Sequence, residues 1–371
     1  MKQCVERTFW ATAVIAAMFS TPFVNAQTRQ RAELTFVANQ SSDNLSGYSI
    51  KAGGGLLVLP NSPFAAGGAP NSVAVVPSGL FIYVADVIPG GISAFSVNQS
   101  KVLTTIPGSP FPAATGTAFV TTDPSGRFLY ALSCGADCSG SGSGEIQAFS
   151  IDQQTGVLTP VAGSPFVAGQ YPYSLAVDPT GYFAYVANAG SGDVYTFAID
   201  NSSGALTQVG LPTAAGTRPL SVVVDPWGQF VYAANTGSSD VSVFAINFDG
   251  SLTAVAGSPF KAGPYVAGVI TSQNGKYILV AAGAGVYVYS VQSSGALDLL
   301  AGSPVAAGTG PNGIALDLDD AFAYVVNAGS SNVSAYSFNS QTGKLTPVKG
   351  SPYSAEAFAA GIATSPVPTH Q

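Results

Sequence analysis

Charged side chains are scarce in this chain of 371 residues, because Asp, Glu, Lys and Arg together make up only 8%. Long surface helices normally carry more Glu, Lys and Arg on their solvent face, so this shortage argues against a helical fold. Hydrophobic residues make up 47%, with 43 Gly and 25 Pro. Disordered segments pair low hydrophobicity with high net charge, which is not the case here. The composition favours a folded β protein of short strands and tight turns.

Histidine is almost absent, since the one His is His370, next to the last residue. Chain ends are commonly disordered, so this side chain is a poor component of a site. A Ser-His-Asp triad and a His-based zinc site both need an internal His. No Asp-rich calcium loop is visible either. We therefore expect no metal and no cofactor.

Long hydrophobic runs are also missing, because Gly, Pro or Asn interrupts each run far short of the ~20 residues of a membrane span. The N-terminus carries Lys2 and Arg7, an apolar run over 9–19 and the small-residue sequence Val24-Asn25-Ala26. This pattern predicts a cleaved signal peptide, with an uncleaved anchor as the alternative. The predicted protein is exported, periplasmic or secreted, without a membrane span after cleavage. Its predicted parts are a signal peptide (1–26), an extension (27–32), a folded domain (33–366) and a tail (367–371).

Basic residues are outnumbered after residue 26, where 10 Lys and Arg face 18 Asp and Glu. A nucleic-acid binder normally shows a basic stripe, so we expect no nucleic-acid partner. The same part of the chain has two cysteines, Cys134 and Cys138. In an oxidising compartment, they predict a disulfide that staples one loop. Metal binding by two cysteines without a His is the weaker alternative.

Internal repetition is the strongest feature of the sequence. The phrase Gly163-Ser164-Pro165-Phe166 recurs along the chain, with a worn copy at Gly210-Leu211-Pro212. The marker prolines are separated by 47, 55, 47, 47, 45 and 48 residues and lie at 63, 110, 165, 212, 259, 304 and 352. The chain therefore contains seven copies of one unit.

Each unit predicts four short strands, which in one copy cover 174–178, 183–188, 194–199 and 206–209. The turn Asp178-Pro179-Thr180-Gly181 joins the first two, because Pro fixes φ and Gly accepts a positive φ. An aromatic residue recurs in the second strand of most copies, for example Tyr185, and in the third strand, for example Phe197. We interpret these two columns as core between neighbouring sheets rather than as ligand contacts.

The two ends of the repeat complement each other. Residues 34–39 match the second strand of a unit, and residues 359–365 match the innermost strand that the first unit lacks. A four-stranded sheet cannot cover both of its faces alone, whereas a closed ring covers every face and protects the edges. We predict an all-β, seven-bladed β-propeller with four antiparallel strands per blade, closed by three N-terminal strands and one C-terminal strand.

The unit "DPTGYFAYVANAGSGDVYTFAID…TGVLTPVAGSPF" resembles the lactonase-type seven-bladed propellers, which are related to 6-phosphogluconolactonase-like and YVTN-repeat proteins. The resemblance covers residues 33–366. It implies a propeller and a site at the channel mouth in which charged residues such as His, Arg and Glu hydrolyse a lactone. Of the few Arg and Glu in this chain, only Arg218, Glu145 and Glu356 could reach that face, so they are the weak catalytic candidates.

The loops leading into each innermost strand lie on the face opposite the Asp-Pro-x-Gly turns, and ligands of propellers usually sit there. The candidate ligand-binding residues on these loops are Arg218, Tyr171, Tyr173, Tyr265, Asn71 and Asn312. Arg218 could bind a carboxylate or phosphate, or could cap a loop carbonyl. The tyrosines could stack on a sugar or peptide, or form a packed rim.

A repeated asparagine after the second strand, at positions 39, 188, 235 and 327, is interpreted as a turn-former. The main hypothesis is a non-enzymatic binding or scaffold module, expected to be a monomer, for a protein, peptide or carbohydrate at the channel mouth. The alternative is a lactone hydrolase acting on an extracytoplasmic sugar or aryl lactone, and whether the chain is an enzyme stays open. A purely structural surface protein is the third option.

Overall fold

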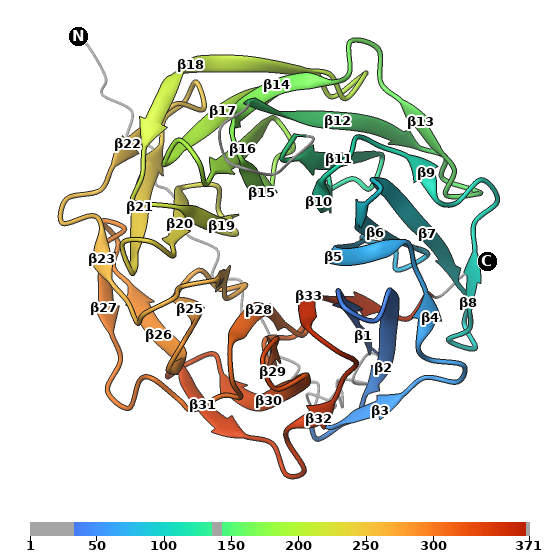
Figure 1. The fold of residues 1–371 in the computed structure, drawn as a ribbon. Coiled ribbons are helices and arrows are strands. Elements are labelled where there is room, and N and C mark those ends of the chain that lie inside the picture. The colour runs from blue at the N-terminus through green and yellow to red at the C-terminus, as the bar shows by residue number, and fades with distance from the viewer. Residues whose placement is uncertain (1–32, 136–142, 369–371) are drawn as a thin grey trace, which may run out of the picture. The chain divides into compact units, whose positions relative to one another are not determined.

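The computed structural model describes residues 33–135 and 143–368, which form strands, turns and loops without a helix. The strands assemble into seven antiparallel sheets. Figure 1 shows these sheets as blades around a central opening, with β5, β10, β15 and β19 among the strands nearest the centre. The predicted seven-bladed β-propeller is therefore confirmed. The predicted signal peptide, the 27–32 extension, Cys138 and His370 lie outside the described residues.

Blades are numbered I to VII, starting with the one that contains β1. The innermost strands of blades II to VII and then I are β5(Gly68–Val75), β10(Thr117–Thr122), β15(Pro172–Val177), β19(Pro219–Val224), β24(Gly268–Thr271), β28(Pro311–Leu316) and β33(Ala359–Pro366). The second strands of blades I to VII are β1(Glu33–Asn39), β6(Phe81–Ile88), β11(Phe128–Ser133), β16(Phe183–Asn188), β20(Phe230–Asn235), β25(Tyr277–Ala282) and β29(Phe322–Asn327). The third strands are β2(Asn44–Ile50), β7(Gly91–Val97), β12(Ser143–Ile151), β17(Asp193–Ile199), β21(Asp240–Ile246), β26(Gly285–Val291) and β30(Asn332–Asn339).

The outermost position is occupied by two short strands in five of the seven blades. These pairs are β3(Leu56–Val58) with β4(Phe64–Ala65), β8(Leu103–Thr105) with β9(Phe111–Pro112), β13(Leu158–Pro160) with β14(Phe166–Gln170), β22(Leu252–Ala254) with β23(Phe260–Lys261), and β31(Lys344–Pro347) with β32(Tyr353–Ser354). Blade IV has the single strand β18(Leu206–Ala214), and blade VI has β27(Leu297–Leu299).

Blade I joins the two ends of the chain, with the strand order β3-β2-β1-β33. Residues 33–39 pair antiparallel with residues 359–366, and Phe36 lies opposite Ala363. The Thr35 hydroxyl also donates to the Ala363 carbonyl at 3.1 Å. If about five of these backbone hydrogen bonds each contribute ~1 kcal/mol net, this seam is a sizeable part of the stability of a typical domain.

The repeated Ser-Pro of the outermost position has a direct structural role. In each intact copy the serine hydroxyl accepts a hydrogen bond from a backbone N–H of the third strand of its own blade. In blade III, for example, Ala148 N donates to Ser164 Oγ at 3.0 Å. The proline that follows is cis in these copies. The serine therefore takes over a ladder hydrogen bond where the outermost strand is interrupted.

The worn copy in blade IV lacks this serine, and the outermost strand is continuous. The sequence predicted this strand over 206–209, whereas β18 extends to Ala214. Its pairing with β17 shifts register between Val194 and Thr196, where extra residues around Gly210 form a bulge. In this blade a bulge, rather than the serine of the Ser-Pro motif, interrupts the regular pairing of the outermost strand.

The two aromatic columns lie at blade interfaces, as predicted. Tyr83, Tyr130, Tyr185, Tyr232 and Tyr324 are completely buried. Most of these hydroxyls donate to the carbonyl of a glycine in the next blade, as Tyr83 does to Gly156 at 2.7 Å. The interface therefore combines apolar burial with a satisfied hydroxyl group. Tyr232 is the exception, because its hydroxyl has no partner among the described residues.

Candidate functional site

The residue that leads into each innermost strand has a positive φ angle in all seven blades. This position holds Gly116 and Gly310 in two blades and Ala69 in a third, but larger side chains in the other four. Their φ angles are 50° for Tyr171, 57° for Arg218, 54° for Tyr265 and 57° for Phe358. A left-handed conformation costs a non-glycine residue about 1 kcal/mol or more, and such residues cluster at functional sites. Four large side chains are thus held on this face at an energetic cost.

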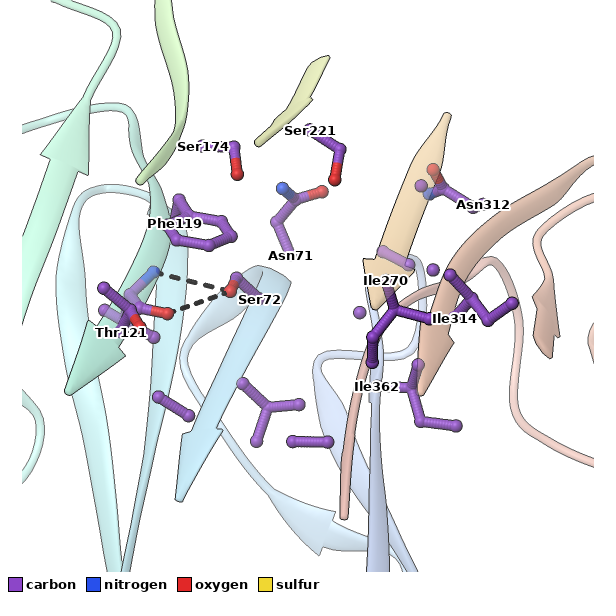
Figure 2. A pocket seen from close by; sticks show the side chains of 18 of the residues that line it. Asn71, Ser72, Phe119, Thr121, Ser174, Ser221, Ile270, Asn312, Ile314 and Ile362 are labelled. Atoms are coloured by element: carbon purple, nitrogen blue, oxygen red, sulfur yellow. Dashed lines mark hydrogen bonds between the residues drawn. The ribbon is translucent and has the colours of Figure 1, made fainter. Parts of the chain in front are cut away.

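The channel between the innermost strands contains a cavity of about 380 Å³, lined by residues of all seven of them. Figure 2 labels Asn71, Ser174, Ser221 and Asn312 around this cavity, together with Ile270, Ile314 and Ile362 from three consecutive blades. None of the described residues that line this cavity is Asp, Glu, Lys, Arg or His. Its polar groups are therefore amides, hydroxyls and backbone atoms.

Serine side chains on the innermost strands were not singled out from the sequence, yet they join neighbouring blades. The Ser174 hydroxyl accepts from Val222 N at 3.2 Å, and the Ser221 hydroxyl accepts from Val269 N at 3.2 Å. Ser72 bonds to the backbone of Val120 in the same way (Figure 2). The wall of the cavity is rigidified by these cross-links. Each serine bonds to a residue 48 positions later, which is close to the length of one repeat.

Tyr173 and Asn71 lie at the mouth of the cavity, and both are half-buried. The Asn71 amide donates to the Ala118 carbonyl of the next blade at 2.8 Å, which fixes its orientation. Burial raises the pKa of the Tyr173 hydroxyl, while a hydrogen bond with Asn71 and the charge of Arg218 oppose the rise. The Tyr173 ring packs against Tyr171 with centroids 5.9 Å apart. The predicted residues Asn71, Tyr171, Tyr173 and Arg218 are therefore neighbours.

The remaining predicted ligand-binding residues are spread around the same face. Asn312 lines the cavity from blade VII (Figure 2). Tyr265 is 74% exposed on the blade next to that of Arg218. Arg218 itself is exposed. The structure thus places two aromatic side chains and one cation at equivalent positions of blades IV, V and VI.

The two candidate carboxylates lie away from the cavity. Glu145 is on β12, where it pairs with Ser133 of β11 and Val167 of β14. Glu356 is exposed on the loop that leads into β33. Its charge acts on Tyr48, which belongs to the third strand of blade I. Neither residue is among the described residues lining the central cavity.

Glu356 also occupies a position that is glycine in most blades. In blades II, IV and VII, the N–H of Gly67, Gly169 or Gly308 donates to a buried side chain at the end of the second strand. A Cβ at Gly169 would lie 2.5 Å from Asn188, so a side chain there requires displacement of the loop. In blade I the corresponding Asn39 Oδ1 has no partner among the described residues.

The repeated asparagines are structural, but not through the left-handed backbone that the turn-former interpretation invoked. None of the four has a positive φ. They are completely buried, and their amides bond to the third strand, as Asn235 Nδ2 does to Asp240 Oδ1 at 2.7 Å and Ser242 Oγ at 2.9 Å. Blade II has Asp86 at this position, and burial raises its pKa to about 6.

Cys134 follows β11 and is buried and disulfide-bonded. Its predicted partner, Cys138, lies outside the described residues. Among the described residues, no group of three or more His, Cys, Asp and Glu side chains is arranged to hold a metal ion. The part of the chain that the structure describes contains no helix long and apolar enough to cross a membrane.

The fold and the cavity define a seven-bladed propeller with a chamber in its channel whose described lining is largely apolar, with a few amides and hydroxyls and no charged side chain. The family model described as "Lactonase, 7-bladed beta-propeller" matches residues 30–218 and 253–361, so the chain belongs to the lactonase family of seven-bladed β-propellers. Among curated proteins, no sequence matches this chain.

Solved structures share the fold. A candidate 6-phosphogluconolactonase from Bacteroides uniformis is 17% identical with a TM-score of 0.76, over 90% of this chain and 100% of that chain. The periplasmic gluconolactonase PpgL from Pseudomonas aeruginosa is 17% identical with a TM-score of 0.74, over 91% of this chain and 100% of that chain. A protein from Lactobacillus plantarum is 19% identical with a TM-score of 0.72, over 90% and 99%.

Proposed function

We propose that this lactonase-family propeller is a binding module that takes a carbohydrate at the channel mouth. The observation that carries the proposal is the chemistry of the central cavity. Its described lining has amide, hydroxyl and backbone groups but no ionisable group that titrates near neutral pH. Such a lining can hydrogen-bond a polyhydroxylated ligand, but it lacks a general base placed to activate water.

The arrangement at the mouth suits a sugar in two further ways. The half-buried Tyr173 ring can contact the apolar face of a pyranose, and its hydroxyl, like any tyrosine hydroxyl at neutral pH, is a neutral donor. Asn71 and Asn312 contribute amides from two blades that are separated by blade I (Figure 2). Pre-formed cavities of roughly 300–1,000 Å³ are typical of small-ligand sites, and the volume of about 380 Å³ falls in that range.

The test is isothermal titration calorimetry with neutral oligosaccharides, namely maltotriose, cellotriose, chitotriose and galactotriose. At least one should bind with a saturable isotherm, and Tyr173→Ala should weaken it about tenfold or more. The matched control is Tyr182→Ala, because Tyr182 is 58% exposed at an Asp-Pro-x-Gly turn of the same blade. No binding to any of the four sugars, or equal losses in the two variants, would remove the proposal.

Lactone hydrolysis is the second candidate function, favoured by the family match and by the fold shared with PpgL. Under this hypothesis, Arg218 would stabilise the oxyanion, and Glu145 or Glu356 would direct water. The purified protein should then release acid from glucono-1,5-lactone above the spontaneous rate in a pH-stat. Arg218→Ala, Glu145→Gln and Glu356→Gln at wild-type rates would reject those roles.

An extracytoplasmic location is part of the proposal. It is supported by the N-terminal pattern over residues 1–26 and by the fold shared with a protein named as periplasmic. Fractionation of cells expressing the full chain, with mass spectrometry of the mature N-terminus, tests it. Cleavage after Ala26 is expected. An intact Met1 in the cytosolic fraction would contradict it.

A further inference from the structure

A second cavity, of about 480 Å³, lies beside Arg218 on the same face as the channel mouth. It is bounded by loops of two blades: residues 189–192 after β16, residues 215–218 before β19, and Ser238 and Asp240 around the next turn. Three of its lining residues are glycines, at positions 190, 192 and 216, so the backbone forms part of the lining without a side chain over it. Ser191, Thr217 and Ser238 also line it; the Ser191 hydroxyl donates to Asp193 and the Ser238 hydroxyl to Asp240, so these two hydroxyls can offer a ligand only acceptor oxygens.

This cavity has two charged residues on its described lining, and they differ in the hydrogen bonds that they already make. Among the described residues that line it, the ionised groups are Arg218 and Asp240. Asp240 Oδ1 already accepts from Asn235 Nδ2 at 2.7 Å and from Ser238 Oγ at 2.9 Å. The Arg218 guanidinium makes no hydrogen bond or ion pair with any residue that the structure describes. Arg218 is therefore the cation that can meet a ligand anion among the described lining residues, and the negative charge of Asp240 lies in the same cavity.

The backbone conformation of Arg218 also points to a binding role for this side chain. Arg218 has a φ of 57°, a conformation that glycine would adopt without a Cβ penalty and that Gly116 and Gly310 adopt in blades III and VII. Its flanking equivalents are Tyr171 and Tyr265, one blade away on either side. An arginine between two tyrosines, at a position that favours glycine, is consistent with retention for binding.

We propose that this cavity is a subsite for an acidic sugar residue, with Arg218 binding the carboxylate and the serine and threonine hydroxyls and glycine backbone binding the ring hydroxyls. A single guanidinium matches the single charge of a carboxylate, which it can hold through two parallel N–H···O bonds. The subsite rests on the proposed function. Tyr173 is on the innermost strand of blade IV and Arg218 directly precedes that of the adjacent blade V, so one oligosaccharide can reach both sites.

The experiment compares two trisaccharides that differ at C6, α-1,4-linked trigalacturonate and α-1,4-linked galactotriose, by calorimetry at low salt. The wild-type protein should bind the acid about tenfold more tightly, and 200 mM NaCl should narrow the difference. Arg218→Gly should abolish the preference without weakening the neutral sugar. Its melting temperature should be unchanged or raised, because glycine accepts the backbone conformation. Arg127→Ala, which removes an exposed arginine near an Asp-Pro-x-Gly turn, should keep the preference.

The outcomes separate the two proposals. Equal affinity for the two trisaccharides, both lost in Tyr173→Ala, overturns the acidic subsite and leaves the channel-mouth site standing. Acid preference that survives Arg218→Gly also overturns the subsite. No binding of either trisaccharide overturns the subsite, and the other three neutral sugars then decide the channel-mouth site. A monosaccharide arm distinguishes the anion, since galactose 6-phosphate binding more tightly than galacturonate would overturn the carboxylate assignment.

Discussion

Replacing Asp86 by Asn should stabilise the protein at neutral pH. Asp86 is 2% exposed at the end of β6, and its carboxylate accepts from Gly67 N, Ser93 N and the Ser93 hydroxyl. These bonds do not offset desolvation, so its pKa is raised from 3.8 to about 6. A difference of this size corresponds to about 3 kcal/mol lost when the buried group is ionised. Four other blades have Asn at this position, and in blade V Asn235 donates to the equivalent serine, Ser242.

The sign of the pH dependence follows from the raised pKa. The stabilisation from the protonated carboxyl is fully present below pH 4 and is lost as pH rises through about 6, because the folded state then has to bury the charge. Urea unfolding of the wild type and Asp86→Asn between pH 4 and pH 7.5 measures the difference. The variant should be more stable by about 3 kcal/mol at pH 7.5 and by little at pH 4. A variant that is no more stable at pH 7.5, or a gap independent of pH, would refute the reasoning.

Three further changes test the blade interfaces and the seam. Gly204→Ala places a methyl group 2.4 Å from the buried Phe128 ring, at a φ of +77°, and should lower the free energy of unfolding by more than 2 kcal/mol in urea. Gly210→Ala, at a φ of +63° with nothing within 4 Å, should lower it by about 1 kcal/mol. Tyr83→Phe loses a buried 2.7 Å hydrogen bond and should lower the free energy of unfolding by about 1–2 kcal/mol. The Tyr232 hydroxyl has no partner among the described residues, so Tyr232→Phe should be neutral or stabilising. Deletion of residues 356–371 removes the strand that pairs with β1 and should yield an aggregating or protease-sensitive product; a soluble truncation with an unchanged melting temperature would contradict the role of the seam.

The architecture could be predicted from the sequence because the even spacing of the repeat shows how many blades there are and where each one lies. The altered copy at Gly210 lies at the expected spacing, so seven repeat units could still be counted. The match of residues 34–39 to a second strand predicted that the two ends of the chain share one blade. The length of β18 could not be predicted, because losing the serine of the Ser-Pro motif turns an interrupted edge into a bulged strand. Short sequence patterns do not show which hydrogen bond replaces a missing one.

The candidate site was predictable residue by residue but not as an arrangement. Asn71, Tyr173 and Asn312 do line the channel cavity, because their shared position in the repeat fixed the face. The cavity beside Arg218 was not foreseen, since its walls come from loops of adjacent blades that the sequence places 20 or more residues apart.

The pairing of β33 with β1 has a consequence for biosynthesis. A hydroxyl of Thr35 meets a carbonyl 328 positions later, so the first and last strands to leave the ribosome must find each other. Loop closure over that separation costs about 5 kcal/mol of chain entropy. Blade I of a nascent chain therefore lacks its innermost strand until residues 359–366 have been synthesised.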